Sequence, residues 1–351
     1  MHVIKARNVH AALPLGLDLL NSLGDKSTSR NGDVIVLADP VTTVYERPRE
    51  RVMFHPERDA NPFFHLLESL WMMGGRNDVG YVANIVDSMR NFSDDGKTFH
   101  AAYGYRWRHH FGVDQIDWAI KRLRKDRNDR RVVIDIWDGN VDPAKGDAGG
   151  KDLPCNLVVK FKINLSGSLD MVVHNRSNDV VWGAYGANAV HFSFLQEYIA
   201  SAVGVPVGRY WQVSDDMHGY PKTFGKVESL GKKSLETRSL VGQGLDNPYI
   251  AGEVEPYPII STDTKTWEED LEIFLAEGAA VGFRDRFFRR VAVPMLSAHS
   301  AYRRRDDELR YVKAREILEQ CIASDWRRAG IEWINRREQA SREKEKNDGA
   351  S

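Results

Sequence analysis

The sequence predicts an α+β fold with a helical C-terminal extension, and three observations support this. Strand and helix patterns mix along the first 230 residues without a regular alternation. After about residue 225 the strand patterns stop and helical spacing dominates. Hydrophobic residues make up 42% of the 351 residues, which is enough for a packed core. We therefore expect an α+β domain over 1–230, a mostly helical extension packed on it over 231–335, and a charged, flexible tail over 336–351.

The elements of the first third follow from periodicity and from the residues that end each segment. Residues 34–45 have a strand composition that is interrupted by an Asp-Pro turn. Residues 62–75 predict a helix, with a proline at the start, apolar side chains on one face and two glycines at the end. Residues 77–102 predict a short helix and then a loop, and residues 114–124 an amphipathic helix.

The middle of the chain is rich in strand patterns. Strands are predicted over 131–137, 157–163, 169–174 and 207–213. A Ser-Gly-Ser turn joins the second and third of these, which predicts a hairpin. Helical periods are expected over 190–203, 266–277 and 307–334.

Composition excludes several classes of protein. Lys and Arg number 49 and Asp and Glu 50, so the chain lacks the basic excess of a protein that coats nucleic acid, and no DNA partner is expected. No apolar run approaches the ~18 residues of a membrane span, and the first residues lack the apolar run of a signal peptide. Two cysteines far apart, Cys155 and Cys321, argue against a disulfide framework and a cysteine zinc site, and no metal is expected.

Cys155 is the first candidate for chemistry. It follows a proline in the segment DLPCN, directly before the alternating strand 157–163. A lone cysteine is most often a small buried hydrophobic residue. The predicted hairpin, however, brings Arg176 back beside Cys155, and a guanidinium near a thiol lowers the thiol pKa and makes the sulfur a nucleophile.

Four arginines are candidates for a phosphate site. Arg130 and Arg131 are adjacent after a predicted helix, and such a pair is most often solvated or salt-bridged. A planar guanidinium is also the preferred partner of a phosphate group. Together with Arg30 and Arg176, the pair is sufficient for one nucleotide phosphate.

Other polar side chains stand in apolar surroundings. Glu68 lies on the apolar helix 62–75, where partial removal from water would suit a proton shuttle, although an ordinary boundary position fits equally well. Tyr103, His218 and Tyr220 could each be a satisfied core side chain. The sequence contains no P-loop, Rossmann or zinc-protease motif.

Taken together and in order, the motifs of residues 29–224 resemble those of thymidylate synthase and its relatives, the pyrimidine nucleotide hydroxymethylases. The similar segments are SRNG, ESLW, AAYGYRWR, NDRRVVI, LPCN, RSNDVVWG and DDMHGY. The resemblance implies a thymidylate synthase-like fold, in which helices cover a large mixed sheet, and a homodimer.

The resemblance also implies roles for individual residues. Catalytic roles fall on the nucleophile Cys155 and on Glu68, Tyr103 and Asp179. Nucleotide phosphate contacts fall on Arg30, Arg130, Arg131, Arg176 and Ser177, with the adjacent pair reaching across a dimer. Base and sugar contacts fall on Asn188, His218 and Tyr220. Strict counting from Gly183 puts Ala187 at the base-binding position, so Asn188 requires one inserted residue.

The implied chemistry is one-carbon transfer to C5 of a pyrimidine nucleoside monophosphate. Addition of the Cys155 thiolate to C6 turns C5 into an enolate or enamine carbon, and the family takes the one-carbon electrophile from 5,10-methylenetetrahydrofolate. Tyr103 with ordered water would remove the C5 proton, and Glu68 would manage protons at the folate and the ring. The resulting exocyclic methylene accepts either hydride, which gives a methyl group, or water, which gives a hydroxymethyl group.

Four departures from thymidylate synthase favour water. No tryptophan lies between Trp71 and Trp107, where synthases carry one or more, and the last residues are charged instead of apolar. Asn156 replaces the histidine that usually follows the nucleophile, and RSNDVV is closer to phage-type deoxycytidylate hydroxymethylases. We therefore expect a nucleotide 5-hydroxymethylase. The alternatives are a thymidylate synthase that converts dUMP to dTMP and a non-catalytic nucleotide- or RNA-binding homologue.

The substrate base stays open at this point. An asparagine at 188 can serve the edge of uracil or, with its amide flipped, part of the edge of cytosine, so dUMP and dCMP are both candidates. The absence of an aspartate there disfavours the cytosine pattern, and Ser177 with the arginine pair suggests a 2′-deoxy sugar. The expected compartment is a reducing cytoplasm, which for a phage protein is that of the host.

Overall fold

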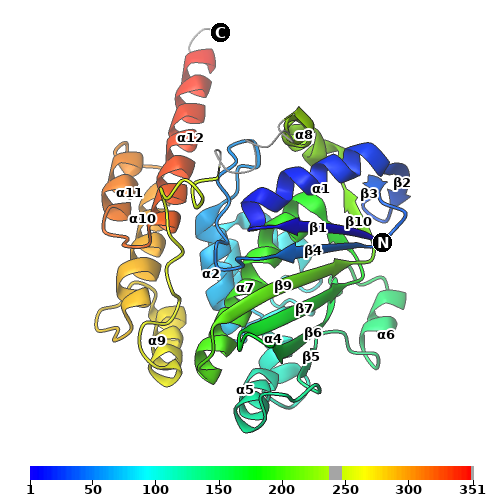
Figure 1. The fold of residues 1–351 in the computed structure, drawn as a ribbon. Coiled ribbons are helices and arrows are strands. Elements are labelled where there is room, and N and C mark those ends of the chain that lie inside the picture. The colour runs from blue at the N-terminus through cyan, green and yellow to red at the C-terminus, as the bar shows by residue number, and fades with distance from the viewer. Residues whose placement is uncertain (237–246, 349–351) are drawn as a thin grey trace.

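The structure, a computed structural model, describes residues 1–236 and 247–348 (Figure 1). Within these residues the strands form a six-stranded and a four-stranded sheet. The larger sheet has the order β1 (His2–Ala6), β4 (Val41–Tyr45), β9 (Val207–Ser214), β7 (Leu169–Asn175), β6 (Asn156–Ile163), β5 (Val133–Asp135). The smaller sheet has the order β2 (Asp25–Ser29), β3 (Gly32–Val36), β10 (Met217–Gly219), β8 (Asn178–Asp179). Parallel pairs β1–β4 and β7–β9 alternate with antiparallel pairs, so the mixed sheet that the resemblance implied is confirmed.

Helices connect and cover these strands. Up to residue 236 they are α1 (Val9–Leu23), α2 (Pro62–Met73), α3 (Val79–Ile85), η1 (Asp87–Phe92), α4 (Tyr103–Tyr105), η2 (Arg106–His110), α5 (Gln115–Lys125), α6 (Asp142–Asp147), η3 (Val180–Ala187), α7 (Asn188–Val203) and α8 (Pro221–Glu236). The predicted α+β class is therefore confirmed. Among the described residues, no helix has the length and apolar character needed to cross a membrane.

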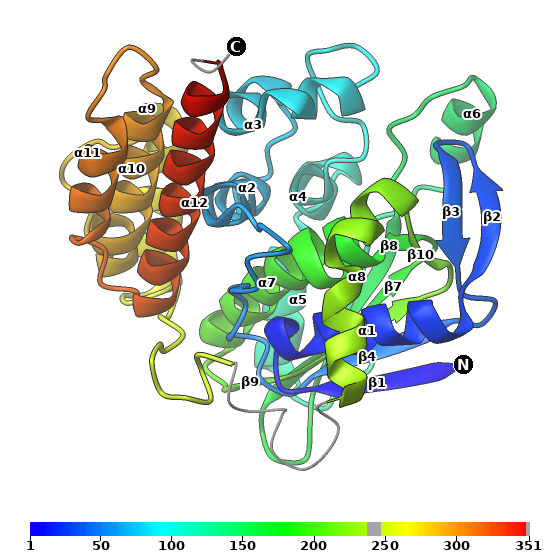
Figure 2. The ribbon, with the colours of Figure 1, turned by 90° about the horizontal axis from the view of Figure 1, so that it is seen from above.

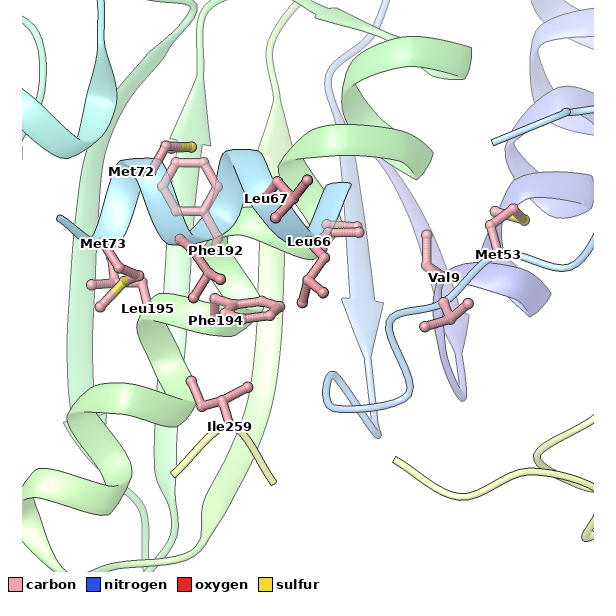
Figure 3. Close-up of a cluster of buried hydrophobic side chains, with 14 of the residues drawn as sticks. Val9, Met53, Leu66, Leu67, Met72, Met73, Phe192, Phe194, Leu195 and Ile259 are labelled. Carbon is pink, nitrogen blue, oxygen red and sulfur yellow. The ribbon is translucent and has the colours of Figure 1, made fainter. Parts of the chain in front are cut away.

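Helix α7 is the centre of the core. It packs on β7 and β9 on one side and on α2 and α5 on the other, and nearly all of its side chains are buried. Figure 3 shows Phe192 and Phe194 of α7 beside Leu66 and Leu67 of α2. The helix ends at Gly204, whose φ of 78° is a left-handed conformation that favours glycine. Because α7 begins at Asn188, its burial fixes the position of that predicted base contact.

Among the described residues, no helix covers the other face of the six-stranded sheet near β1 and β4, although Val44 on that face is buried. In Figure 2 the helices lie on one side of β1 and β4. Strand pairing aligns the outward side chains in rows, because directly paired residues point to the same face. One row runs Lys5, Val44, Trp211, Val172, Lys160. This face thus combines an apolar strip with lysines at its two ends.

The C-terminal helices pack against α2 and also contact α7, where Phe194 lies 6.4 Å from Trp326 and Tyr198 lies 5.2 Å from Trp267, measured between ring centroids. They are α9 (Thr264–Glu277), η4 (Phe288–Ala292), α10 (Val293–Arg303), α11 (Arg310–Leu318) and α12 (Ser324–Asp348). The ring of Phe63 in α2 lies 5.5 Å from His299 and 5.6 Å from Trp333, measured between ring centroids. Figures 1 and 2 show the helices side by side next to α2.

The predicted boundaries in this part differ from the observed helices. Helix α8 crosses the boundary expected at residue 230 and packs on α1, so the helical extension does not begin there. Helix α12 continues to Asp348, whereas the sequence predicts a flexible tail from residue 336. Arg336 and Arg337 both pair with Asp59, which attaches the first part of that segment to the domain. Residues 237–246 of the expected extension and 349–351 of the expected tail lie outside the described residues.

Candidate active site

Cys155 lies at the start of β6, where the β6–β7 hairpin brings Arg176 beside it. The Arg176 amide donates to the Cys155 carbonyl oxygen at 2.9 Å, and its Nη2 lies 3.9 Å from the Cys155 Sγ. The Arg176 Nε also donates to the carbonyl oxygen of Pro154 at 3.0 Å. The hairpin therefore places the guanidinium where the sequence predicts it, and the thiol is half-buried rather than sealed in the core.

The thiol does not have the lowered pKa that the sequence predicts. Burial raises the pKa of Cys155, and the nearby Asp152 carboxylate raises it further. Arg176 and Arg30 lower the pKa, but their effect is smaller than that of burial. The prediction considered only the guanidinium and left out the cost of burying a thiolate.

Arg30 approaches the same loop from the β2–β3 turn. Its Nη1 and Nη2 donate to the carbonyl oxygens of Gly150 and Lys151, both at 3.2 Å. The side chain is exposed, and it contributes to the electrostatics of Cys155. Arg30 and Arg176 thus flank the nucleophile loop, with the half-buried Ser177 directly after Arg176.

Tyr103 opens the short helix α4 beside the nucleophile. Burial raises the pKa of its phenol strongly, and the charge of Cys155 raises it further. Asn156 and the backbone N–H groups of Cys155 and Asn156 act in the opposite direction. The hydroxyl is therefore close to the thiol and stays protonated in the resting site.

Glu68 of α2 faces His191 of α7. The Glu68 Oε2 and His191 Nε2 atoms are 3.0 Å apart, and the two side chains are only 12% and 4% exposed. Neither atom has an aligned hydrogen-bond partner among the described residues. A buried carboxylate oxygen without such a partner is available to a ligand.

Three asparagines form a buried amide chain next to Cys155. The Asn156 Nδ2 donates to the Asn188 Oδ1 at 3.3 Å, and the Asn188 Nδ2 donates to the Asn178 Oδ1 at 3.1 Å. Asn178 in turn donates to the Ser214 Oγ at 2.9 Å. A Cβ at Gly183 would lie 2.5 Å from the Asn178 Oδ1, so glycine is required for this packing.

Asp179 follows Asn178 of this row of amides, and it lies close to His218 and Tyr220. Strands β8 and β10 pair in parallel, with Asp179 opposite His218. The Asp179 Oδ1 accepts from the backbone N–H groups of Val181 at 2.9 Å and Trp182 at 2.5 Å, while its buried Oδ2 has no partner among the described residues. Burial raises the pKa of Asp179. His218 and Tyr220 have ring centroids 5.3 Å apart.

Comparison with known proteins shows which family this chain belongs to. A family model described as thymidylate synthase matches residues 60–241. A deoxyuridylate hydroxymethyltransferase of Pseudomonas phage M6 is 54% identical over 340 residues, which is 97% of this chain and 95% of that protein.

This chain belongs to the thymidylate synthase family. A deoxyuridylate hydroxymethyltransferase of Bacillus phage SP01 is 37% identical over 60% of this chain and 57% of its own length. A putative thymidylate synthase of Methanothermobacter marburgensis is 38% identical over 40% of this chain and 60% of its own length. The predicted family and enzyme class, a pyrimidine C5 one-carbon transferase, are confirmed.

Two predicted phosphate ligands of this family member lie far from Cys155. Val133 pairs with Lys160, so Arg131 is level with Lys162, seven residues along β6 from the nucleophile. At about 3.3 Å per residue this separation is about 23 Å. Arg131 is 76% exposed and is held by Asp129, and Arg130 is exposed beside it. Within one chain these two arginines cannot contact a nucleotide bound at Cys155.

Three of the other predicted residues, Cys155, Asn188 and Glu68, are linked through neighbouring residues. Cys155 adjoins Asn156, whose side chain contacts Asn188 at the start of α7, and one turn later His191 faces Glu68. A pocket of about 300 Å³ is lined by Asp152 of the nucleophile loop, but by none of the predicted site residues. The polar side chains that line it are Asn77, Asp94, Asp95, Thr98, His100, Tyr105, His110, Lys145 and Asp152.

Four polar residues at the site were missed by the sequence analysis as candidates for a role. Asp152 and Asn156 flank the nucleophile in sequence, and Asn178 stands inside the RSND motif. Their closeness in sequence to predicted site residues could therefore have identified them. His191 has no such signal, because its contact with Glu68 joins two helices that are far apart in sequence.

Proposed function

We propose that this protein is a deoxyuridylate hydroxymethylase, which adds a hydroxymethyl group to C5 of dUMP. The main support is the side-chain amide of Asn188, which hydrogen bonds with Asn156 and Asn178 hold in one orientation next to the Cys155 nucleophile. The names of the phage relatives that match most of this chain or more than half of it support the same substrate.

The orientation of Asn188 favours uracil over cytosine. Asn178 and Asn156 each use one hydrogen-bonding position of the Asn188 amide, which leaves one N–H and one oxygen lone pair free. Uracil offers the complementary O4 acceptor and N3–H donor. Cytosine offers the reverse pattern, and a flip of Asn188 would place like groups against both neighbouring asparagines. The buried row of hydrogen-bonded asparagine amides therefore supports dUMP as the substrate.

The residues around the base divide the work of binding and proton transfer. Arg30, Arg176 and Ser177 would hold the phosphate, and His218 with Tyr220 would bind the sugar hydroxyl. Cys155 would add to C6 of the ring. Tyr103 would relay the C5 proton, and its proximity to the Cys155 sulfur supports that role. Burial raises the pKa of Cys155, so the resting thiol is protonated and would lose its proton as it adds to C6.

The site also fits 5,10-methylenetetrahydrofolate as the one-carbon donor. The buried carboxylate oxygen Asp179 Oδ2 has no hydrogen-bond partner among the described residues, and Glu68 Oε2 has only the ion-pair contact with His191 Nε2 at 3.0 Å. Such acceptors suit the N–H donors of a pterin ring, so Glu68 and Asp179 would hold it. When bound, this group supplies a carbon unit at the oxidation level of formaldehyde.

A homodimer would complete the phosphate site. Arg130 and Arg131 lie at the β5 edge of the sheet face that carries Val44 and Trp211, about 23 Å from Cys155 of their own chain. A second copy placed on that face would bring its arginine pair to this chain's nucleotide. The apolar strip of Val44, Trp211 and Val172 supports such a contact.

Subunit complementation tests the dimer. The Cys155→Ala protein and an Arg130→Ala/Arg131→Ala protein should each lack activity. Their mixture should regain about one quarter of wild-type activity, because half of randomly formed dimers contain one intact site of two. A mixture that stays inactive, although sedimentation shows exchanged dimers, would contradict the shared site.

Mass spectrometry of the nucleotide product tests the function itself. Wild-type enzyme with methylenetetrahydrofolate should convert dUMP to 5-hydroxymethyl-dUMP with release of tetrahydrofolate. Formation of dTMP with dihydrofolate would instead establish a thymidylate synthase. Turnover of dCMP in place of dUMP would reverse the base assignment, and a wild-type protein that binds dUMP without turnover would establish the non-catalytic alternative. Because a reduced thiol and a nucleoside monophosphate are both required, we place the reaction in a cytoplasm, including that of a phage host.

A further inference from the structure

Asp152, in the loop that carries the nucleophile, also lines a polar pocket. The volume of this pocket is about 300 Å³, and its lining includes three carboxylates: Asp94, Asp95 and Asp152. A polar cavity of this size holds ordered water. The pocket reaches the nucleophile loop through Asp152, which only two residues separate from Cys155 in sequence.

Asp152 differs from the other two carboxylates in its partners. Asp94 pairs with Lys145 at 2.8 Å, and Asp95 accepts from groups of its own turn, including the Thr98 hydroxyl at 2.8 Å. Asp152 accepts only from the backbone N–H groups of His100 at 2.6 Å and Ala101 at 3.3 Å, as far as the described residues go. It is half-buried, and its charge acts on the Cys155 sulfur.

These contacts fix Asp152 without neutralising it. The two N–H groups belong to the segment directly before Tyr103, so the carboxylate is tied to the backbone that carries another residue of the site. Burial raises the pKa of Asp152, and the neighbouring Asp94 raises it further. A carboxylate with a raised pKa is a better proton acceptor than a solvated one.

We propose that Asp152 is the general base for water, drawn from this pocket, that adds to the exocyclic methylene and gives the hydroxymethyl product. This inference rests on the proposed function, and it identifies Asp152 as the residue that makes water the final reactant.

The step balances in atoms and charge. The oxygen of water bonds to the exocyclic carbon while one of its protons passes to the Asp152 carboxylate. The electrons of the methylene double bond shift into the ring and then restore the C5–C6 double bond. The bond from C6 to the Cys155 sulfur breaks, and the sulfur leaves as a thiolate. No oxidant or reductant takes part.

Other carboxylates of the site are less suited to this step. Glu68 Oε2 faces His191 at 3.0 Å, and Asp179 is turned toward the backbone N–H groups of Val181 and Trp182. Neither residue lines the pocket. Asp152 alone among the site's described carboxylates combines contact with the pocket and an electrostatic effect on Cys155.

A partition experiment tests the proposal. Enzyme, dUMP and methylenetetrahydrofolate are mixed for a single turnover with a small thiol, such as 2-mercaptoethanol, which competes with water for the methylene. Mass spectrometry then gives the ratio of hydroxymethyl to thioether nucleotide. This ratio counts only molecules that reach the methylene, so an inactive or misfolded fraction does not change it.

We expect Asp152→Asn to lower the ratio by at least about tenfold, because a positioned base contributes roughly 10²–10⁴-fold to a proton transfer. Asp95→Asn makes the same chemical change in the same pocket and should leave the ratio at the wild-type value. An unchanged ratio in Asp152→Asn would overturn the proposal. Loss of both products alike would also overturn it, since Asp152 would then act before the branch. Failure of the wild-type enzyme to form any hydroxymethyl product would refute the proposed function instead.

Discussion

Replacement of Asn188 by aspartate should reverse the preference between dUMP and dCMP. The change is isosteric, and Asn188 is only 8% exposed, so the new carboxylate cannot turn to solvent. It removes the N–H group that would serve uracil O4 and places a second acceptor there. Cytosine carries an amino donor at the same position, which a carboxylate accepts.

The magnitude follows from the burial of the pair. A lost hydrogen bond costs about 0.5–1.5 kcal/mol, and a buried acceptor left unsatisfied costs about 1–3 kcal/mol more. The sum of roughly 2–4 kcal/mol corresponds to a fall of about 30- to 1000-fold in kcat/KM for dUMP. The amide chain itself can adapt, because Asn178 can invert and accept from the Ser214 hydroxyl.

The assay is kcat/KM for both nucleotides with product identity by mass spectrometry. Asn178→Asp is the matched control, since it makes the same change one step further from the base and should affect both nucleotides alike. If Asn188→Asp retained the wild-type preference for dUMP, the argument from the amide chain would be refuted, and another residue would select the base.

Three further predictions follow from single contacts. His191→Gln should lower kcat by about tenfold with an unchanged nucleotide KM, because Glu68 loses the side chain that faces it; steady-state kinetics checks this. Gly183→Ala should raise the KM for dUMP, because the new Cβ would lie 2.5 Å from the Asn178 Oδ1; unchanged binding in calorimetry would contradict it. Burial raises the pKa of Asp325 to about 7, so its contribution to stability is lost as the pH rises from about 4 to 7. At ~1.4 kcal/mol for each of about three pKa steps, the upper bound is ~4 kcal/mol. In urea titrations at several pH values, Asp325→Asn should remove this part of the pH dependence of the unfolding free energy. The same pH dependence in wild type and variant would refute the assignment.

Long periodic segments could be predicted from the sequence, and short or irregular ones could not. The hairpin of β6 and β7 and the central helix α7 show clear periods of two and of 3.6 residues. Helix α1 was missed because it contains Pro14, which is an unusual residue within a helix. Strand β8 has two residues and exists only through its pairing with β10, which no local pattern reports.

Candidate site residues could be predicted where they belong to a recognisable sequence motif. The segments around Cys155 and Arg176 carry their own signatures, and the hairpin explains why they meet. The contact of Glu68 with His191 depends on the packing of two helices and has no sequence signature. The thiol pKa was also out of reach, because it depends on how much of the side chain the fold buries.

The C-terminal extension contacts both helices that carry the Glu68–His191 pair, α2 through Phe63 and α7 through Phe194. Phe63 faces the extension, where Trp333 and His299 contact its ring, and Glu68 lies five residues further along the same helix. At about 100° per residue these two side chains point about 140° apart, toward opposite faces. Helix α2 is therefore held between the extension and α7, and Asp59, just before its start, is fixed by Arg336 and Arg337 of α12. We therefore expect the extension to help position Glu68 relative to His191.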